Sequence, residues 1–151
     1  MIVHENPYFA VHLENGFYLL DFPDEQVAVL PVIEERLFLC IESIRPTFER
    51  PLIEMPSGGV KSGETLEVAA LRELEEETGV RVLDTNRLKP LPPLNIIPSR
   101  TSKMLNVFRL DLSMEEYSAR GAHDEEVAGV ILLSKKELAD SYKGTLLTSS
   151  G

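Results

Sequence analysis

Residues 58–80 read GGVKSGETLEVAALRELEEETGV, a glycine-rich loop that runs into a helical pattern. Apolar side chains recur in the second part at the spacing of one helix face, at Leu66, Ala69, Ala70 and Leu74. Thr65 is a suitable N-cap, and Gly79 stands where a helix would stop. The pattern predicts a helix over Thr65–Glu77, preceded by a loop over Pro56–Gly63.

The acidic residues of this predicted helix gather on one side. Glu73, Glu76 and Glu77 are three and four positions apart, so their side chains project together. Such a face is either solvated or a site for a divalent cation, whose preferred ligands are carboxylate and carbonyl oxygens. Anions are disfavoured in the last turn of a helix, yet Glu75 also stands in that turn. Acids placed there despite this cost favour a metal site over a solvated face.

Apolar runs on both sides of the motif predict a mixed sheet. Strands are expected at Gly16–Phe22, Val27–Ile33, Leu37–Ile44, Val80–Leu83, Met104–Leu112 and Val127–Leu133. The prolines of Lys89–Pro98 predict a loop, and Ser134 with Glu137 predicts a capping box for a last helix ending near Tyr142. Strands outnumber helices, so the expected fold class is α/β (α+β) with a mixed sheet.

A few residues within these runs carry narrower expectations. Glu34 and Glu35 separate two apolar runs and are expected at the tip of a hairpin. Pro31 has no backbone N–H, so we expect it at a sheet edge or a bulge. Cys40 is expected to be a small buried core residue, because no histidine lies near it in the sequence.

Composition and charge bound the functional class. Of 151 residues, 43% are hydrophobic and 26% charged, which suits a single domain over residues 1–151. The 25 acidic and 15 basic residues give a net charge of −10, which argues against partners such as nucleic acid or an anionic membrane. No secretory signal or membrane-length apolar run is visible, and a lone cysteine fits a reducing compartment. We expect a cytoplasmic protein.

The glycine-rich loop differs from a phosphate-binding P-loop at one decisive position. Gly58–Thr65 reads GGVKSGET, whereas the P-loop pattern G-x-x-x-x-G-K-[ST] requires lysine where Glu64 stands. A carboxylate at that position would repel the phosphates that the lysine attracts. The P-loop interpretation is therefore excluded.

The same stretch resembles the Nudix box. All nine specified positions of that signature are present: Gly58, Glu64, Arg72, Glu73, Leu74, Glu76, Glu77, Gly79 and Val80. The resemblance implies an α/β/α Nudix sandwich with its catalytic loop–helix motif. It also implies a Nudix hydrolase that uses Mg²⁺ or Mn²⁺ to cleave the pyrophosphate bond of a nucleoside diphosphate linked to another moiety.

The resemblance further implies roles for single residues. The implied metal ligands are the side chains of Glu73, Glu76 and Glu77 and the backbone carbonyl of Ser57. Arg72 would orient these carboxylates by salt bridging, with Glu64 as its partner. Gly58 and Gly79 would serve the shape of the backbone.

Segments outside the box resemble ADP-ribose and nucleoside diphosphate-sugar pyrophosphatases. Leu52–Gly59 resembles their E-[LI]-P-A-G-G run and Ile44–Pro46 their Y-R-P element, so Arg45 and Glu54 become candidates for substrate contact. The implied substrate is ADP-ribose or a nucleotide sugar, cleaved to a nucleoside monophosphate and a sugar phosphate.

Two loops bear on catalysis and specificity. In those relatives an acid from a late loop often acts as the base, and Glu126, then Glu125, are the matching residues here. The segment Pro98–Lys103 departs from the relatives, because it carries two cations and no acid. Arg100 and Lys103 either contact a substrate phosphate or are solvated.

Other assemblies and activities remain open from the sequence. Many of these relatives dimerise through N-terminal strands, so Phe17, Tyr18 and Leu20 are candidates for a homodimer interface as well as for the core. One alternative activity is a nucleoside triphosphate pyrophosphohydrolase that cleans the nucleotide pool. Another is a non-catalytic nucleotide-binding Nudix module, against which the intact glutamate triad argues.

Overall fold

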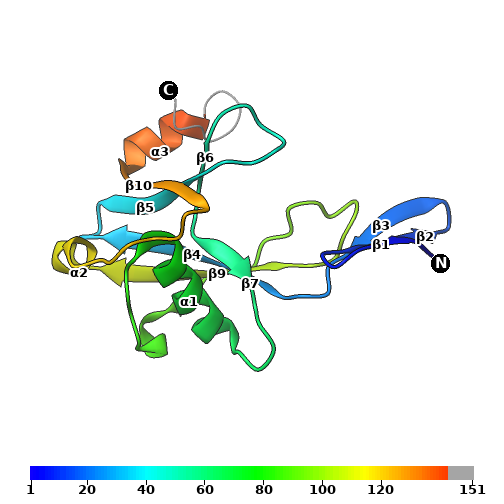
Figure 1. Cartoon of the computed structure of the whole chain (residues 1–151), viewed down its shortest axis with the longest axis horizontal. Helices are drawn as coiled ribbons and strands as arrows, with labels where there is room; N and C mark the ends of the chain where they lie inside the picture. The colour runs from blue at the N-terminus through cyan, green and yellow to red at the C-terminus, as the bar shows by residue number, and fades with distance from the viewer. Residues whose placement is uncertain (143–151) are drawn as a thin grey trace.

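The computed structural model describes residues 1–142, and a mixed sheet of seven strands forms its centre (Figure 1). The main order is β10-β5-β4-β9-β8, with β6 beside β5 and β7 beside β4. The strands are β4 Gln26–Ile33, β5 Leu37–Ser43, β6 Leu52–Glu54, β7 Ser57–Gly59, β8 Lys89–Pro90, β9 Leu105–Leu112 and β10 Val127–Ser134. Only β4 and β9 pair in parallel within this sheet of the described residues, so the mixed sheet predicted from the sequence is confirmed.

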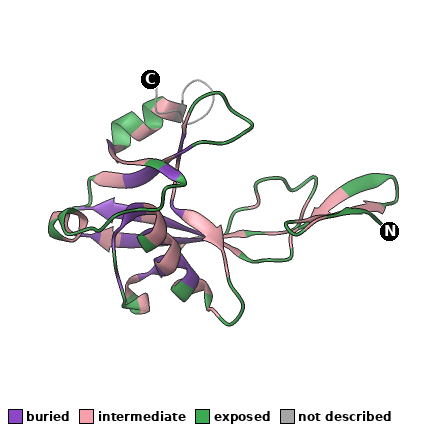
Figure 2. Cartoon of the chain, viewed as in Figure 1, coloured by how far each residue is buried: buried purple, intermediate pink, exposed green. Residues whose placement is uncertain are grey.

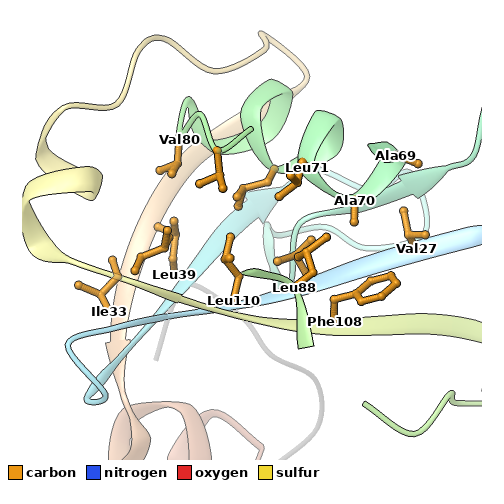
Figure 3. Packing of buried hydrophobic residues seen from close by; sticks show 14 residues of the cluster. Val27, Ile33, Leu39, Ala69, Ala70, Leu71, Val80, Leu88, Phe108 and Leu110 are labelled. Atoms are coloured by element: carbon orange, nitrogen blue, oxygen red, sulfur yellow. The ribbon is translucent and has the colours of Figure 1, made fainter. Parts of the chain in front are cut away.

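Helices cover both faces of this sheet. On one face, α1 (Leu66–Thr78) packs its apolar side onto the strands, as the side chains in Figure 3 show; this side consists of Ala69, Ala70, Leu71 and Leu74. On the other face, Leu138 of α3 (Lys135–Tyr142) packs against Cys40. Successive residues of β5 point to opposite faces of the sheet, since Leu39 packs in the hydrophobic cluster under α1 and Cys40 in the cluster under α3. The layers are α/β/α.

Both long helices begin as their sequences predict. The Thr65 hydroxyl accepts the N–H of Val68 at 3.2 Å and caps α1. Ser134 and Glu137 form the expected capping box at α3, with side-chain-to-backbone distances of 3.2 and 2.7 Å. The remaining helical segments are α2 (Met114–Ser118) and the 3-10 helix η1 (Thr85–Arg87). No helix within residues 1–142 is long and apolar enough to cross a membrane.

A separate antiparallel sheet is formed by the first residues of the chain. Its strands are β1 Ile2–Glu5, β2 Ala10–Glu14 and β3 Phe17–Asp21, in the order β1-β2-β3. The sheet extends away from the main body and carries no buried residue (Figures 1 and 2). The N–H of Leu20 donates to the carbonyl of Arg100 at 2.7 Å, which ties this sheet to the loop before β9.

The prediction for Pro31 was wrong in its location. Pro31 lies inside β4, which has β5 on one side and β9 on the other, and its side chain is fully buried. The N–H of Val29 donates to the carbonyl of Pro56 at 2.9 Å, and alternate residues of a strand face the same side. The backbone nitrogen of Pro31 therefore points to the side of β4 where β7 and β5 lie. Neither strand pairs with β4 at this residue, because the β7 pairing ends at Ala28 and the β5 pairing begins at Val32.

The strand predicted at Val80–Leu83 was also wrong. Val80 and Val82 are buried and Leu83 is exposed, so the alternation of faces is present. A strand additionally needs a neighbouring backbone, and the pairings of the described residues place none beside this segment. The predicted loop Lys89–Pro98 differs slightly, since it begins with the two residues of β8.

Candidate metal site on the acidic helix

The glycine-rich loop is held against the beginning of β4, in the central sheet, by strand pairing. Ser57, Gly58 and Gly59 form β7 and pair with the first residues of β4. The carboxyl group of Glu73 lies directly over Gly58, where an added Cβ would be 2.2 Å from the carboxyl carbon. Position 58 therefore has to be glycine if the Glu73 carboxylate is to keep this place.

Arg72 links the loop and the helix through five hydrogen bonds. Its Nε and Nη2 donate to the two carboxylate oxygens of Glu64 at 2.8 and 2.9 Å. Its Nη1 donates to Glu73 at 2.7 Å and to Glu76 at 3.1 Å, and Nη2 also donates to the carbonyl of Gly59 at 2.9 Å. Arg72 thus gathers three acids around one guanidinium, which lowers the pKa of Glu64 to about 2.

Glu77 has a different environment from its neighbours. Its Oε2 accepts the N–H of Ser57 at 2.8 Å, so the Ser57 backbone and this carboxylate are adjacent. Burial raises the pKa of Glu77 to about 7, and burial also raises the pKa of Glu73. The pair Arg45–Glu54 lies close enough to act on Glu77 electrostatically.

Arg45 and Glu54 form a two-pronged ion pair. Arg45 Nε donates to Glu54 Oε1 at 3.0 Å, and Nη2 donates to Oε2 at 2.6 Å. Glu54 is in β6, beside the end of β5, so strand pairing places these two sequence-predicted residues together. About half of the Arg45 side chain is exposed, at 49%, and the pair therefore borders the acidic site while remaining accessible.

The late loop, which comprises residues 119–126 between α2 and β10, lies against the end of α1. The N–H of Asp124 donates to the carbonyl of Glu76 at 2.7 Å, and the N–H of Gly121 donates to the carbonyl of Gly79 at 2.8 Å. Glu125 and Glu126, the candidates for the base, follow immediately and are exposed. The structure thus brings the loop that carries them to the last turn of the acidic helix.

The two cations of the Pro98–Lys103 segment line different hollows. Lys103 lines a cavity of about 500 Å³ that also includes Ser57, and its ammonium lies 3.2 Å from Glu25. Arg100 lines a separate hollow with His12 and residues of β3. Only Lys103 of this pair therefore shares a cavity with the candidate site.

The donor set fits a hard divalent cation. Glu73, Glu76 and Glu77 of α1 and the Ser57 backbone offer only oxygen atoms as ligands, which Mg²⁺ and Mn²⁺ prefer. Within residues 1–142, no three His, Cys, Asp or Glu side chains stand in metal-holding geometry. The reason is visible in the contacts: Arg72 lies between Glu73 and Glu76, while Glu77 faces the Ser57 N–H.

Sequence reasoning missed the walls of the 500 Å³ cavity. They include Tyr8 and Phe22 from the N-terminal part of the chain and Leu94 and Ile96 from the loop after β8. These segments are far apart in the sequence, and no motif connects them. The exposed apolar residues in a proline-rich loop were the one available signal.

An acidic helix fastened by an arginine to a glycine loop defines a candidate site for a divalent cation. Residues 23–146 match the NUDIX domain family, and the chain belongs to this family.

Individual relatives agree with this assignment. An "ADP-ribose pyrophosphatase" of Bacillus subtilis (strain 168) is 34% identical over 118 residues, which are 76% of this chain and 62% of that protein. A "Methanol dehydrogenase activator" of Bacillus methanolicus is 28% identical over 117 residues, or 78% of this chain and 62% of that protein. The aligned part thus spans about 62% of the length of these curated relatives. A crystal structure of an ADP compounds hydrolase shares the fold, with a TM-score of 0.66 at 21% identity, covering 95% of this chain and 80% of that one.

Proposed function

We propose that the protein is a Nudix hydrolase that cleaves the pyrophosphate bond of ADP-ribose or a nucleotide sugar with the help of Mg²⁺ or Mn²⁺. The observation that carries the proposal is the arrangement around Arg72, which binds the carboxylates of both Glu73 and Glu76, with the Glu73 carboxylate lying over Gly58. The relatives named as ADP-ribose and ADP-sugar pyrophosphatases support the substrate class. The products would be a nucleoside monophosphate and a sugar phosphate.

Each part of the site has a role in this proposal. The ligands of the cation would be Glu73, Glu76, Glu77 and the carbonyl of Ser57. When bound, the cation would offset the negative charge of the pyrophosphate and lower the pKa of a water molecule. Arg72 and Glu64 keep the carboxylates on the correct face of the helix. Glu126, or else Glu125, takes the proton from the attacking water.

The cavity beside Ser57 suits the organic part of such a substrate. Tyr8, Phe22 and the aliphatic residues of the loop after β8 supply apolar surface for a base or sugar face. Lys103 can approach a phosphate, and Arg45 and Glu54 offer polar contacts at the other border of the site. A space of about 500 Å³ is of the size that small-molecule sites usually have.

The expectations on assembly and location belong to the same proposal. We infer one Nudix domain over residues 1–151, of which 143–151 lie outside the described part, in a cytoplasmic homodimer without nucleic-acid or membrane partners. The N-terminal sheet supports the dimer, because Phe17 and Tyr18 are 62% and 58% exposed. Leu20 is instead half-buried beside the Arg100 segment and is the weaker interface candidate.

A substrate panel tests the function. ADP-ribose, ADP-glucose, UDP-glucose, a dinucleotide polyphosphate and ATP would each be incubated with and without Mg²⁺, and the products identified by ³¹P NMR. We expect Mg²⁺-dependent release of a nucleoside monophosphate from ADP-ribose or a nucleotide sugar. Release of pyrophosphate from ATP alone would favour the pool-cleaning alternative. Silence across the panel would favour a binding module.

A further inference from the structure

The segment between α2 and β10 is attached to α1 through its backbone. Gly121 donates its N–H to Gly79, and Asp124 donates its N–H to Glu76, at 2.8 and 2.7 Å. Residues 119–126 are all exposed, so the segment has no buried side chain of its own to fix it. The two amide hydrogen bonds to the last turn of α1 are therefore central to its placement.

This attachment depends on an approach that only glycine permits. Gly79 has a φ of +78°, and a Cβ built on it would be 2.1 Å from the carbonyl oxygen of Gly121. The reverse does not hold, since a Cβ on Gly121 would meet Gly79 at 3.9 Å, an ordinary contact. The close packing thus requires glycine at the helix end and tolerates a side chain on the loop.

We propose that Gly79 is a positioning residue that seats residues 121–126 against α1 and so places the late-loop acids beside the metal face. Glu76 connects the two parts, because its carboxylate belongs to the candidate ligand set while its carbonyl receives the Asp124 N–H. The inference rests on the proposed function in one respect, namely that Glu126 or Glu125 takes a proton from water. The seating of the loop itself is independent of that function.

Hydrogen exchange tests the seating without any substrate. Gly79→Ala would be compared with Gly16→Ala, whose glycine has a nearly equal φ of +82° but nothing within 4 Å of its Cβ. We expect the Gly121 and Asp124 amides to exchange at least tenfold faster in Gly79→Ala and at the wild-type rate in Gly16→Ala. Gly121→Ala should preserve this protection as well. Equal protection in Gly79→Ala and the wild type would overturn the proposal.

Kinetics test the consequence for the reaction. For Gly79→Ala we expect kcat to fall at least tenfold, while KM and the Kd for Mn²⁺ stay within about threefold. In a variant that already lacks the base (Glu126→Gln or Glu125→Gln, whichever loses the acidic limb of the pH profile), adding Gly79→Ala should change kcat less than twofold. Multiplicative effects, or loss of Mn²⁺ binding, would overturn the positioning role.

A second variant covers the case in which Gly79→Ala does not fold. Asp124→Pro deletes the amide that donates to Glu76 and leaves α1 untouched. It should show the same fall in kcat and the same dependence on the acid, and an unchanged kcat would contradict the proposal. If the wild type hydrolyses nothing on the panel, the proposed function fails, while the exchange rates still decide whether Gly79 seats the loop.

Discussion

Replacing Gly58 by alanine should displace Glu73, one of the proposed metal ligands, and leave the fold intact. The new Cβ would stand 2.2 Å from the Glu73 carboxyl carbon and 2.3 and 2.5 Å from its oxygens. Comfortable contacts between heavy atoms begin at about 3.5 Å, so the carboxyl group must move by more than about 1 Å. That group is the end of a flexible side chain, and it can move without shifting the backbone.

The displacement converts into a loss of activity. A misplacement of about 1 Å near a reacting centre costs on the order of 10²-fold in rate. We therefore expect Gly58→Ala to lower kcat/KM about 100-fold at fixed Mg²⁺ and to need more Mg²⁺ for half-maximal activity. Its free energy of unfolding should stay within about 1 kcal/mol of the wild type, because no core side chain is altered.

Gly59→Ala is the matched control for this experiment. Its Cβ would meet only the Gln26 side-chain nitrogen, at 3.5 Å, and its carbonyl can still accept from Arg72. We expect activity within about threefold of the wild type. Equal losses in the two variants, or an active Gly58→Ala with unchanged Mg²⁺ dependence, would refute the assignment of Glu73 as a ligand held over Gly58.

Two further substitutions test the ion pairs. Arg72→Lys keeps at most three of the five hydrogen bonds, so urea denaturation should show that the free energy of unfolding falls by about 2 kcal/mol. The control Arg81→Lys, at an exposed arginine, should lose less than about 0.5 kcal/mol. Equal losses in the two variants would contradict the role given to Arg72. Arg87 holds the pKa of Glu116 at about 2, so the stability that this ionised carboxylate contributes is present above its unfolded pKa of about 4.5 and is lost as pH falls toward 2. Glu116→Gln should therefore cost about 1 kcal/mol or less at pH 7, and this cost should shrink steadily between pH 4.5 and pH 2. A constant difference from pH 7 to 2 would contradict this reasoning.

The sequence predicted the parts of the fold that local patterns determine. The helix of residues 66–78 and its caps at Thr65 and Gly79 follow from spacing and from residues with strong terminal preferences. The segment Val80–Leu83 failed as a strand because alternation reports which faces are buried and not whether a partner strand exists. The location of Pro31 depended on where two pairings end, which is a property of the assembled sheet.

In the candidate site, too, residues close together in the sequence could be predicted, whereas contacts between distant segments could not. Glu64, Arg72 and Glu73 could be found from the sequence because they lie on one loop and one helix, within reach of each other. The joining of Gly79 to Gly121 could not, because it depends on how the late loop returns to the helix. The walls of the cavity beside Ser57 come from three distant segments and have no shared periodicity.

The central claim is that the carboxylates on one face of α1 hold the cation that hydrolysis requires. The most direct measurement is Mn²⁺ affinity by titration calorimetry, combined with hydrolysis rates, for Glu76→Gln and its neighbour Glu75→Gln. Glu75 is half exposed and lies near Arg81, away from the Arg72 cluster. We expect Glu76→Gln to weaken Mn²⁺ binding at least tenfold and to lower kcat at least 100-fold, with Glu75→Gln within twofold of the wild type. Equal behaviour of the two variants would contradict the claim.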